Sequence, residues 1–213
     1  MRFAMVYSCG KDSTLALHKM IELGHEAVCL VVMVNKEADR SYFHGADRAM
    51  LDRYSNALGL PMLTCPAGGE DYHLALEDGL RRAKDMGAEG AAFGDIDIEG
   101  NRKWEEDRCK AAELSPCFPL WQRGREENVY ELMELGYRCI IKSVDTSLLP
   151  LELLGKFIAP DTVAAMRAAG IDICGEYGEY HTLAVDGPVF HSPVPYQLGR
   201  EMILEHHAVI EIC

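Results

Sequence analysis

The first residues of the chain restrict the fold more than any other part of the sequence. Phe3 to Tyr7 form a run of apolar and aromatic residues with the length of a buried strand. The run passes through the small and polar residues Ser8–Ser13 into a helical pattern that stops at Gly24. A strand that turns directly into a helix places free backbone N–H groups and the positive end of the helix dipole at one point. The sequence therefore predicts an α/β fold with an anion site at its first turn.

The side chains of this turn suit a phosphate ligand, with one exception. Gly10 lets the backbone approach a phosphate, Lys11 adds a positive charge, and Ser8 and Ser13 add hydroxyl donors. The carboxylate of Asp12 is explained if it holds Mg²⁺ or caps the helix. The alternative is a helix N-terminus with ordinary capping residues and no ligand.

Two widespread phosphate loops do not match this turn. A Walker loop needs Gly five residues before Gly10 and Ser or Thr directly after the Lys, but Met5 and Asp12 occupy these positions. The dinucleotide-binding fingerprint needs three spaced glycines, and only Gly10 is present.

Strands and helices alternate over the first 121 residues. We predict further strands at 27–34, 61–65, 88–93 and 116–121, and helices at 46–58, 70–86 and 99–109. The helix at 70–86 is expected to turn four side chains inward: Leu74, Leu76, Leu80 and Ala83. Alternation of this kind implies right-handed βαβ crossovers and a parallel sheet, with the proline-containing strand 116–121 at an edge or at its start.

Ligands of such sheets bind beyond the carboxyl ends of the strands. Three loops are expected at these ends, namely Ser8–Ser13, the polar loop 35–44 and Gly94-Asp95-Ile96. We therefore expect the three loops to meet around one ligand. The alternative for Asp95 is that it only caps a turn.

A break in the pattern near residues 121–126 predicts a domain of residues 1–122 followed by a smaller α/β domain of residues 123–213. Helices are expected at 128–135, 148–157 and 162–169, and a strand at 137–144. The segment from Gly175 to Thr182 gathers two acids, a histidine and a threonine between glycines. Alternation puts Glu179 and His181 on one face of this segment. It forms either a polar site or the polar edge of a hairpin that turns at Asp186-Gly187.

Composition limits the kinds of substrate and the cellular compartment that we expect for the chain. The net charge of −13, from 21 basic and 34 acidic residues, disfavours a nucleic-acid substrate. The longest basic cluster, Gln122–Arg125, is followed directly by two glutamates. No apolar run approaches the roughly 20 residues that span a bilayer, and no secretory signal is visible, so we expect a cytoplasmic protein. The eight cysteines have no CxxC spacing and are expected to be free thiols.

Four motifs occur in a fixed order along the chain. They are Ser8–Ser13; Gly94-Asp95-Ile96 with Arg102, Trp104, Glu106 and Cys109; Pro119-Leu120-Trp121; and Gly175–Thr182 with Asp186-Gly187-Pro188 and Phe190. The first resembles the Ser-Gly-Gly-x-Asp-Ser pyrophosphate loop of the ATP pyrophosphatases, with Cys9 in place of the first Gly. Cysteine is small enough for the loop to form unless this position requires a positive φ. The set as a whole resembles the diphthine–ammonia ligase family in its short bacterial branch.

The resemblance covers essentially the whole chain and implies an α/β fold with a HUP-type, Rossmann-like parallel sheet that has helices on both faces, followed by a smaller substrate domain. It implies an enzyme that activates a carboxylate with ATP, releases pyrophosphate and transfers the acyl group from AMP to ammonia. In the reaction that gives the family its name, the carboxylate belongs to diphthine on elongation factor 2. The carboxylic-acid substrate of this chain is expected to be protein-borne or a small molecule.

The resemblance also assigns roles to individual residues. ATP would be held by Ser8, Cys9, Gly10, Lys11, Asp12, Ser13, Gly94 and Asp95, with Asp12 also a ligand of Mg²⁺. The acyl or ammonia side would be lined by Arg102, Glu106, Glu176, Glu179 and Thr182. The catalytic groups would be Lys11, Asp12, Glu179 and His181. Lys11 would stabilise charge on the phosphates, and Glu179 or His181 would accept a proton from ammonium.

Two other functions compete with this one. An adenylating enzyme that transfers sulfur to tRNA is disfavoured by the acidic charge and by the lack of paired cysteines. An ATP-binding regulatory module similar to the universal stress proteins is disfavoured by the second polar segment, Gly175–Thr182, which a sensor does not need. The sequence leaves the oligomeric state open, a homo-oligomer included.

Overall fold

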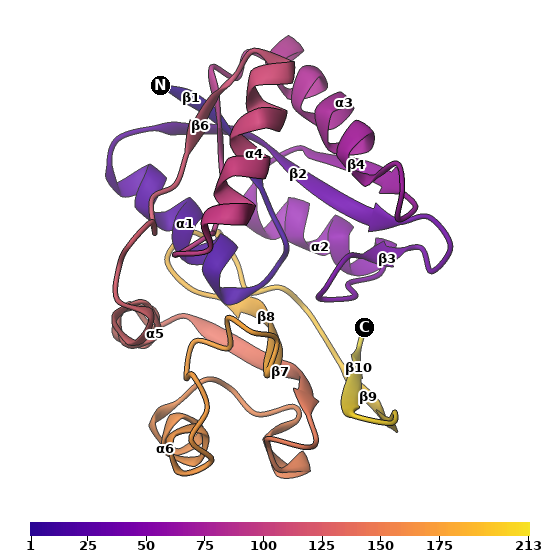
Figure 1. The fold of residues 1–213 in the computed structure, drawn as a ribbon, viewed down its shortest axis with the longest axis vertical. Coiled ribbons are helices and arrows are strands. Elements are labelled where there is room, and N and C mark those ends of the chain that lie inside the picture. Colours follow the sequence, from indigo (N-terminus) through magenta and orange to yellow (C-terminus); the bar gives the residue numbers. More distant parts are fainter.

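The computed structural model describes residues 1–213 and contains two sheets, one above the other in Figure 1. The first sheet has the order β3-β2-β1-β5-β6, and β4 also pairs with β2. Its strands are β1 (Arg2–Val6), β2 (Glu26–Asn35), β3 (Arg40–Ser41), β4 (Met62–Ala67), β5 (Gly90–Ala92) and β6 (Ser115–Cys117). All pairs are parallel except that of β2 with the short β3. The predicted parallel sheet is confirmed, and β6 lies at its edge as the prolines suggested.

Helices cover both faces of this sheet, as expected. They are α1 (Lys11–Glu22), α2 (Arg48–Leu58), α3 (Tyr72–Asp85) and α4 (Glu99–Ala112). The buried residues of α1 and α2 belong to one hydrophobic cluster and those of α3 and α4 to another, on the opposite side of the strands. Helix α2 begins where the Asp47 carboxylate accepts a hydrogen bond from Met50 N at 2.8 Å, and it ends at Gly59 in the left-handed conformation that such a stop favours.

The second sheet is antiparallel and has the order β8-β7-β10-β9. It comprises β7 (Arg138–Asp145), β8 (Tyr180–Asp186), β9 (Leu198–Ile203) and β10 (His207–Ile212), accompanied by α5 (Arg125–Glu134), α6 (Pro160–Ala168) and the 3₁₀ turn η1 (Leu151–Leu153). This agrees with the expected smaller α/β unit. No helix of the protein combines the length and the apolar character that a membrane crossing requires.

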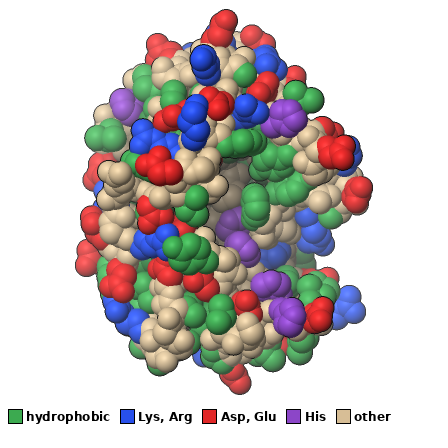
Figure 2. Space-filling model, in the orientation of Figure 1, with side chains coloured by type: hydrophobic (Ala, Val, Ile, Leu, Met, Phe, Trp, Pro, Cys, Tyr) green, Lys and Arg blue, Asp and Glu red, His purple; other side chains and the backbone are tan.

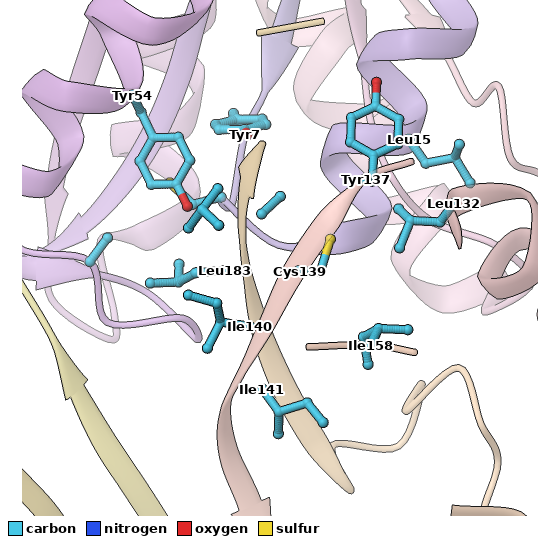
Figure 3. Close-up of a cluster of buried hydrophobic side chains, with 14 of the residues drawn as sticks. Tyr7, Leu15, Tyr54, Leu132, Tyr137, Cys139, Ile140, Ile141, Ile158 and Leu183 are labelled. Atoms are coloured by element: carbon cyan, nitrogen blue, oxygen red, sulfur yellow. The ribbon is translucent and has the colours of Figure 1, made fainter. Parts of the chain in front are cut away.

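The two sheets share one core. The larger cluster of 44 buried residues combines side chains of β1, α1 and α2 with side chains from both faces of β7 and β8. Figure 3 shows Tyr7 and Leu15 of the first unit beside Cys139, Ile140 and Leu183 of the second. Two hydrogen bonds join β8 directly to the first turn: Ala184 N donates to Cys9 O at 2.9 Å, and Lys11 N donates to Thr182 Oγ1 at 3.1 Å. The second unit therefore closes over the N-terminal loop.

Three sequence expectations are wrong. The strand expected at 116–121 is shorter and earlier, because β6 ends at Cys117 and the chain turns from Pro119. Leu74 is 56 % exposed, because the inward stripe of α3 runs through Leu76, Leu80 and Ala83, and a residue two positions before Leu76 lies on the opposite side of the helix. The segment 148–157 holds only the short turn η1 instead of a helix. Its last residues extend along β7, where Gly155 N donates to Ile141 O at 2.9 Å, so pairing with the sheet overrides the helical pattern.

The Asp186-Gly187 turn does not lead into a paired hairpin strand. β8 pairs with β7 on one side, and the chain after Gly187 crosses to the hairpin of β9 and β10, which the sequence pattern did not reveal. The segment Gly175–Thr182 is consequently bound to the first unit at its β8 end.

Candidate active site

A cleft that contains most of the expected site residues lies at the carboxyl ends of β1, β2 and β5. Its volume is about 290 Å³, at the lower end of the range for small-molecule sites. The three loops expected to meet there do so, and the second unit closes the cleft with residues of the Gly175–Thr182 segment. Figure 2 shows this face hollowed between the two units, with histidine and hydrophobic side chains around the hollow. The polar groups that line it are Ser8, Lys11, Asp12, Ser13, His44, Asp95, Glu105, Glu176, His181 and Thr182.

The loop before α1 leaves two amides without a partner in the protein. Ser8 and Ser13 join their hydroxyl groups at 3.0 Å, and the Ser8 hydroxyl accepts a hydrogen bond from Gly10 N at 3.3 Å. The backbone N–H groups of Asp12 and Ser13 make no hydrogen bond to the chain. These two donors and the N-terminus of α1 form the kind of site that binds an anion.

Cys9 and Gly10 lie beneath the cleft and do not line it. Cys9 is fully buried and has a φ of 69°, so this position does require the left-handed conformation that glycine adopts easily. A cysteine there costs about 1–2 kcal/mol of backbone strain. Burial raises the pKa of its thiol, which keeps Cys9 neutral. Gly10 makes room for His44, because a side-chain carbon at this position would collide with the imidazole ring.

Lys11 is the positive charge of the cleft. Its ammonium group lies 2.7 Å from Asp12 Oδ2 and 5.5 Å from the centre of the Tyr180 ring. Burial alone would lower the pKa of Lys11, but the combined effect of its neighbours, with the charge and hydrogen bond of Asp12 foremost, raises this pKa well above its ordinary value. Lys11 therefore remains protonated although it is buried.

Three further carboxyl groups line the cleft, and each has a raised pKa. Burial raises the pKa of Asp95, and it raises that of Glu105 to about 11, with the charge of Asp95 adding to the effect. Burial, together with the charge of Asp12, raises the pKa of Glu176 to about 7. A pKa of about 7 makes Glu176 titrate near neutral pH, where a proton acceptor is most useful.

Two histidines from different units meet at the cleft. His44 Nδ1 lies 2.6 Å from Thr182 O, and its ring packs edge-on against His181 with the centroids 5.2 Å apart. Burial lowers both pKa values, that of His44 to about 3, aided by His181, and that of His181 with the help of the Lys11 charge. Both imidazoles are therefore neutral at pH 7.

Sequence reasoning did not single out His44 and Glu105. A signal existed for each: His44 ends the loop 35–44 that was expected at the site, and Glu105 lies in the helix that directly follows the Asp95 loop. The loop reaches the cleft because Lys142 of β7 donates a hydrogen bond to Gly45 O at 3.0 Å. That contact between units has no local sequence signature.

Besides Cys9 and Gly10, three residues expected at the site lie outside the cleft, namely Arg102, Glu106 and Glu179. Arg102 pairs with Glu106 at 2.9 Å, and its guanidinium group lies over the rings of Phe118 and Trp121 at 5.3 and 4.7 Å. Glu179 is buried beside the cleft, where its Oε2 accepts a hydrogen bond from Tyr177 N at 3.0 Å. The other candidate residues that line the cleft are Ser8, Lys11, Asp12, Ser13, Gly94, Asp95, Glu176, His181 and Thr182.

Substitution of Gly94 tests whether the loop before α1 binds the nucleotide. A side-chain carbon at Gly94 would lie 2.9 Å from Ser13 N and 3.0 Å from the carbonyl carbon of Asp12, and backbone atoms cannot turn aside as a side chain can. Gly94→Ala is expected to weaken ATP binding about tenfold or more, a loss of about 1.4 kcal/mol. Isothermal titration with MgATP measures the effect. Gly100→Ala, on α4 with no atom within 4 Å of the added carbon, is the matched control, and equal affinities of the two variants would contradict the prediction.

Comparison with known proteins assigns both units to one family. The family model for the diphthamide synthase N-terminal domain matches residues 1–116, and the model for the C-terminal domain of the same synthase matches residues 124–211. Diphthine–ammonia ligase of Rattus norvegicus is 27 % identical over 228 residues, covering 95 % of this chain and 85 % of the relative. The human enzyme of that name is 28 % identical over 222 residues, covering 91 % of this chain and 82 % of the relative.

Two further similarities are weaker, the first because it covers a small part of the relative and the second because the sequence identity is low. The diphthine–ammonia ligase of Schizosaccharomyces pombe is 27 % identical across 100 % of this chain, which spans 38 % of that relative. A solved structure described as a predicted subunit of a tRNA methyltransferase from Methanocaldococcus jannaschii covers 91 % of this chain and 100 % of its own, with 13 % identity and a TM-score of 0.46.

Proposed function

Because this chain belongs to the diphthamide synthase family, we propose that it is an ATP-dependent ligase that adenylates a carboxylate, releases pyrophosphate and transfers the acyl group to ammonia. The observation that best supports this in the chain itself is the composition of the cleft. A protonated lysine and two unpaired backbone amides lie in the same cleft as Glu176, whose pKa is about 7. An anion-binding site together with a proton acceptor is what adenylation followed by amide formation requires.

The phosphates of ATP would bind at the N-terminus of α1. The N–H groups of Asp12 and Ser13 would donate to them, and the Lys11 ammonium group would stabilise the charge on the departing pyrophosphate. Aromatic side chains that line the cleft, Tyr42, Phe43, Tyr72 and Phe93, together with Met33, suit a purine base.

The donor set of the cleft fits Mg²⁺. Asp12, Asp95 and Glu176 offer carboxylate oxygens, the ligands that this ion prefers, but no group of three such side chains is arranged to hold a metal alone. This agrees with the usual binding of Mg²⁺ by one or two carboxylates together with substrate phosphates. We assign Asp12 as its protein ligand. When bound, Mg²⁺ would neutralise charge on the phosphate oxygens.

Glu176 is our choice for the group that accepts a proton from the nucleophile. Its carboxylate lines the cleft, whereas Glu179 is turned into the protein and the lowered pKa of His181 makes that imidazole a weak base. His181 and Thr182 would contact the acyl group. Arg102 and Glu106, outside the cleft, would contact a more distant part of the acid substrate.

The carboxylic-acid substrate is protein-borne or a small molecule, and we propose no nucleic-acid substrate. The longest basic cluster contains Arg123 and Arg125, and both form ion pairs within the chain. Arg123 pairs with Glu127 at 2.7 Å, and Arg125 pairs with Asp97 at 2.7 Å. The eight free cysteines fit a reducing compartment such as the cytoplasm. We retain residues 1–122 as the ATP domain and 123–213 as the substrate domain.

The reaction is tested with ATP, Mg²⁺, ammonium and a panel of acids that includes elongation factor 2 carrying diphthine. AMP, pyrophosphate and an amide are the expected products. ADP as the product would contradict the proposal, and tight ATP binding without turnover on any acid would favour a regulatory module.

Glu179→Gln separates the two glutamates of the Gly175–Thr182 segment. The amide oxygen of Gln can still accept the hydrogen bond from Tyr177 N, so kcat for amide formation is expected to stay within about threefold of the wild type. Glu179→Ala leaves that N–H without its partner and is expected to lower the thermal stability by about 1–3 kcal/mol. Kinetics and thermal unfolding of the pair provide the measurement, and a loss of kcat in the Gln variant beyond tenfold would restore Glu179 as the base.

A further inference from the structure

Arg125, the first residue of α5, joins three segments of the chain. Its Nε and Nη2 atoms donate to the two carboxylate oxygens of Asp97, both at 2.7 Å, and Nη1 donates to Asp172 Oδ2 at 2.6 Å. The guanidinium group lies 4.6 Å from the centre of the Tyr177 ring, and Nη2 donates to the Tyr177 hydroxyl at 3.3 Å. All three guanidinium nitrogens therefore have partners outside α5.

The partners of this arginine belong to the two loops that carry acidic groups of the cleft. Asp97 follows Asp95 by two residues in the loop after β5. The other two partners bracket the turn that carries Glu176, and Asp172 also accepts a hydrogen bond within this turn, from Cys174 N at 2.9 Å. One side chain thus connects the Asp95 loop of the first unit to the Glu176 turn of the second.

We propose that Arg125 is a positioning residue, which holds the Glu176 turn against the Asp95 loop and so fixes the carboxyl group of Glu176 relative to the nucleotide. The inference rests on the proposed function, because it takes Glu176 to be the proton acceptor. A guanidinium fork suits this role, since it binds two carboxylates in fixed directions, which an ammonium group cannot do. A catalytic group displaced by about 1 Å loses on the order of 10²-fold in rate.

Arg125 also acts on Glu176 through its charge. Glu176 faces Lys11 and Asp12 of α1, Asp95 of the loop after β5, and Arg125. Burial, Asp12 and Asp95 raise the pKa of Glu176, whereas Lys11 and Arg125 lower it. Removal of the arginine therefore shifts the pH at which Glu176 loses its proton upward. A role limited to stability would leave this pH unchanged.

The chain offers a matched control in α6. Arg167 forms the same kinds of contact far from the cleft: an ion pair with Glu126 at 2.5 Å, a hydrogen bond to the Tyr130 hydroxyl at 2.9 Å, and a position 5.9 Å from the centre of that ring. Loss of Arg125 removes ion pairs with two carboxylates and a contact with a tyrosine ring, and loss of Arg167 removes one ion pair and a contact with a tyrosine ring. Of the two variants, only the loss of Arg125 releases a segment that lines the cleft, namely the turn that carries Glu176.

The experiment compares Arg125→Gln, Arg125→Lys and Arg167→Gln with the wild type. Amide formation on elongation factor 2 carrying diphthine gives kcat, KM for ATP and the pH profile. Hydrogen exchange in the presence of MgATP reports on residues 172–178. Arg125→Gln is expected to lower kcat by about tenfold or more, to leave KM for ATP within about threefold, and to move the acidic limb to higher pH. Arg125→Lys should be intermediate, and Arg167→Gln should match the wild type within about twofold.

The exchange measurement keeps this inference separate from the proposed function. Faster exchange of residues 172–178 in Arg125→Gln, with residues 160–168 unchanged, supports positioning. Exchange and kinetics that match those of Arg167→Gln would overturn it. If the wild type forms no amide, the proposed function fails, and the exchange of residues 172–178 alone decides whether Arg125 holds the turn.

Discussion

Asp12→Asn is expected to reduce AMP formation by about three orders of magnitude while the protein remains folded. Asn has almost the shape of Asp and the side chain is 29 % exposed, so the substitution removes charge without leaving a void. Two losses combine: Lys11 loses the ion-pair partner at 2.7 Å that keeps its pKa high, and Mg²⁺ loses its protein ligand. Single-turnover release of pyrophosphate at several Mg²⁺ concentrations measures the effect.

The control for Asp12→Asn is Asp47→Asn, at the start of α2. Asp47 is also an aspartate at a helix N-terminus, where it accepts a hydrogen bond from Met50 N at 2.8 Å, but it does not line the cleft. Asn caps helices about as well as Asp, so this variant should keep its activity. Retention of more than about a tenth of the wild-type rate by Asp12→Asn would remove Asp12 from the mechanism.

Glu176→Gln is expected to lower kcat for amide formation by about 10²–10³-fold and to abolish the acidic limb of its pH profile. Burial raises the pKa of Glu176 to about 7, so the wild-type carboxyl is protonated below that pH and cannot accept a proton. The wild-type rate should therefore be full above pH 7 and fall as the pH drops through it. Gln does not titrate, and its residual rate should be flat once the concentration of free ammonia is held constant at each pH.

Thermal unfolding at pH 8 separates this effect from loss of structure. Burial disfavours the charged form of Glu176, so a folded-state pKa raised above the unfolded one makes the carboxylate a cost to stability as pH rises. Gln carries no such charge and is not expected to lower the melting temperature at pH 8. An acidic limb near pH 7 that persists in Glu176→Gln would identify another group as the base.

The parts of the fold that follow from local pattern were predictable from sequence. The apolar run of β1, the small residues after it and the stop at Gly24 define the first βα unit, and the crossover rules then bring three loops to one edge of the sheet. These rules correctly predicted that the Asp95 loop lies at the cleft.

The parts of the site that depend on contacts between the units were not predictable. His44 reaches the cleft because Gly10 leaves room for its ring and Lys142 anchors the loop, and these residues are far apart in the sequence. Glu179 was expected to share a face with His181 along a strand, but β8 begins only at Tyr180, and His181 lines the cleft whereas Glu179 does not. Period-two reasoning holds only inside the paired strand.

The hydrogen bonds from Lys11 N to Thr182 and from Ala184 N to Cys9 have a consequence for the history of such chains. The strand that completes the N-terminal loop is encoded more than 160 residues after it, and the two halves bury their side chains in one another. A gene that recombined near codon 122 would join a loop to a strand that had not co-evolved with it. We therefore expect that exchange of one half between distant relatives yields a chain that folds less stably and binds nucleotide less tightly than either parent.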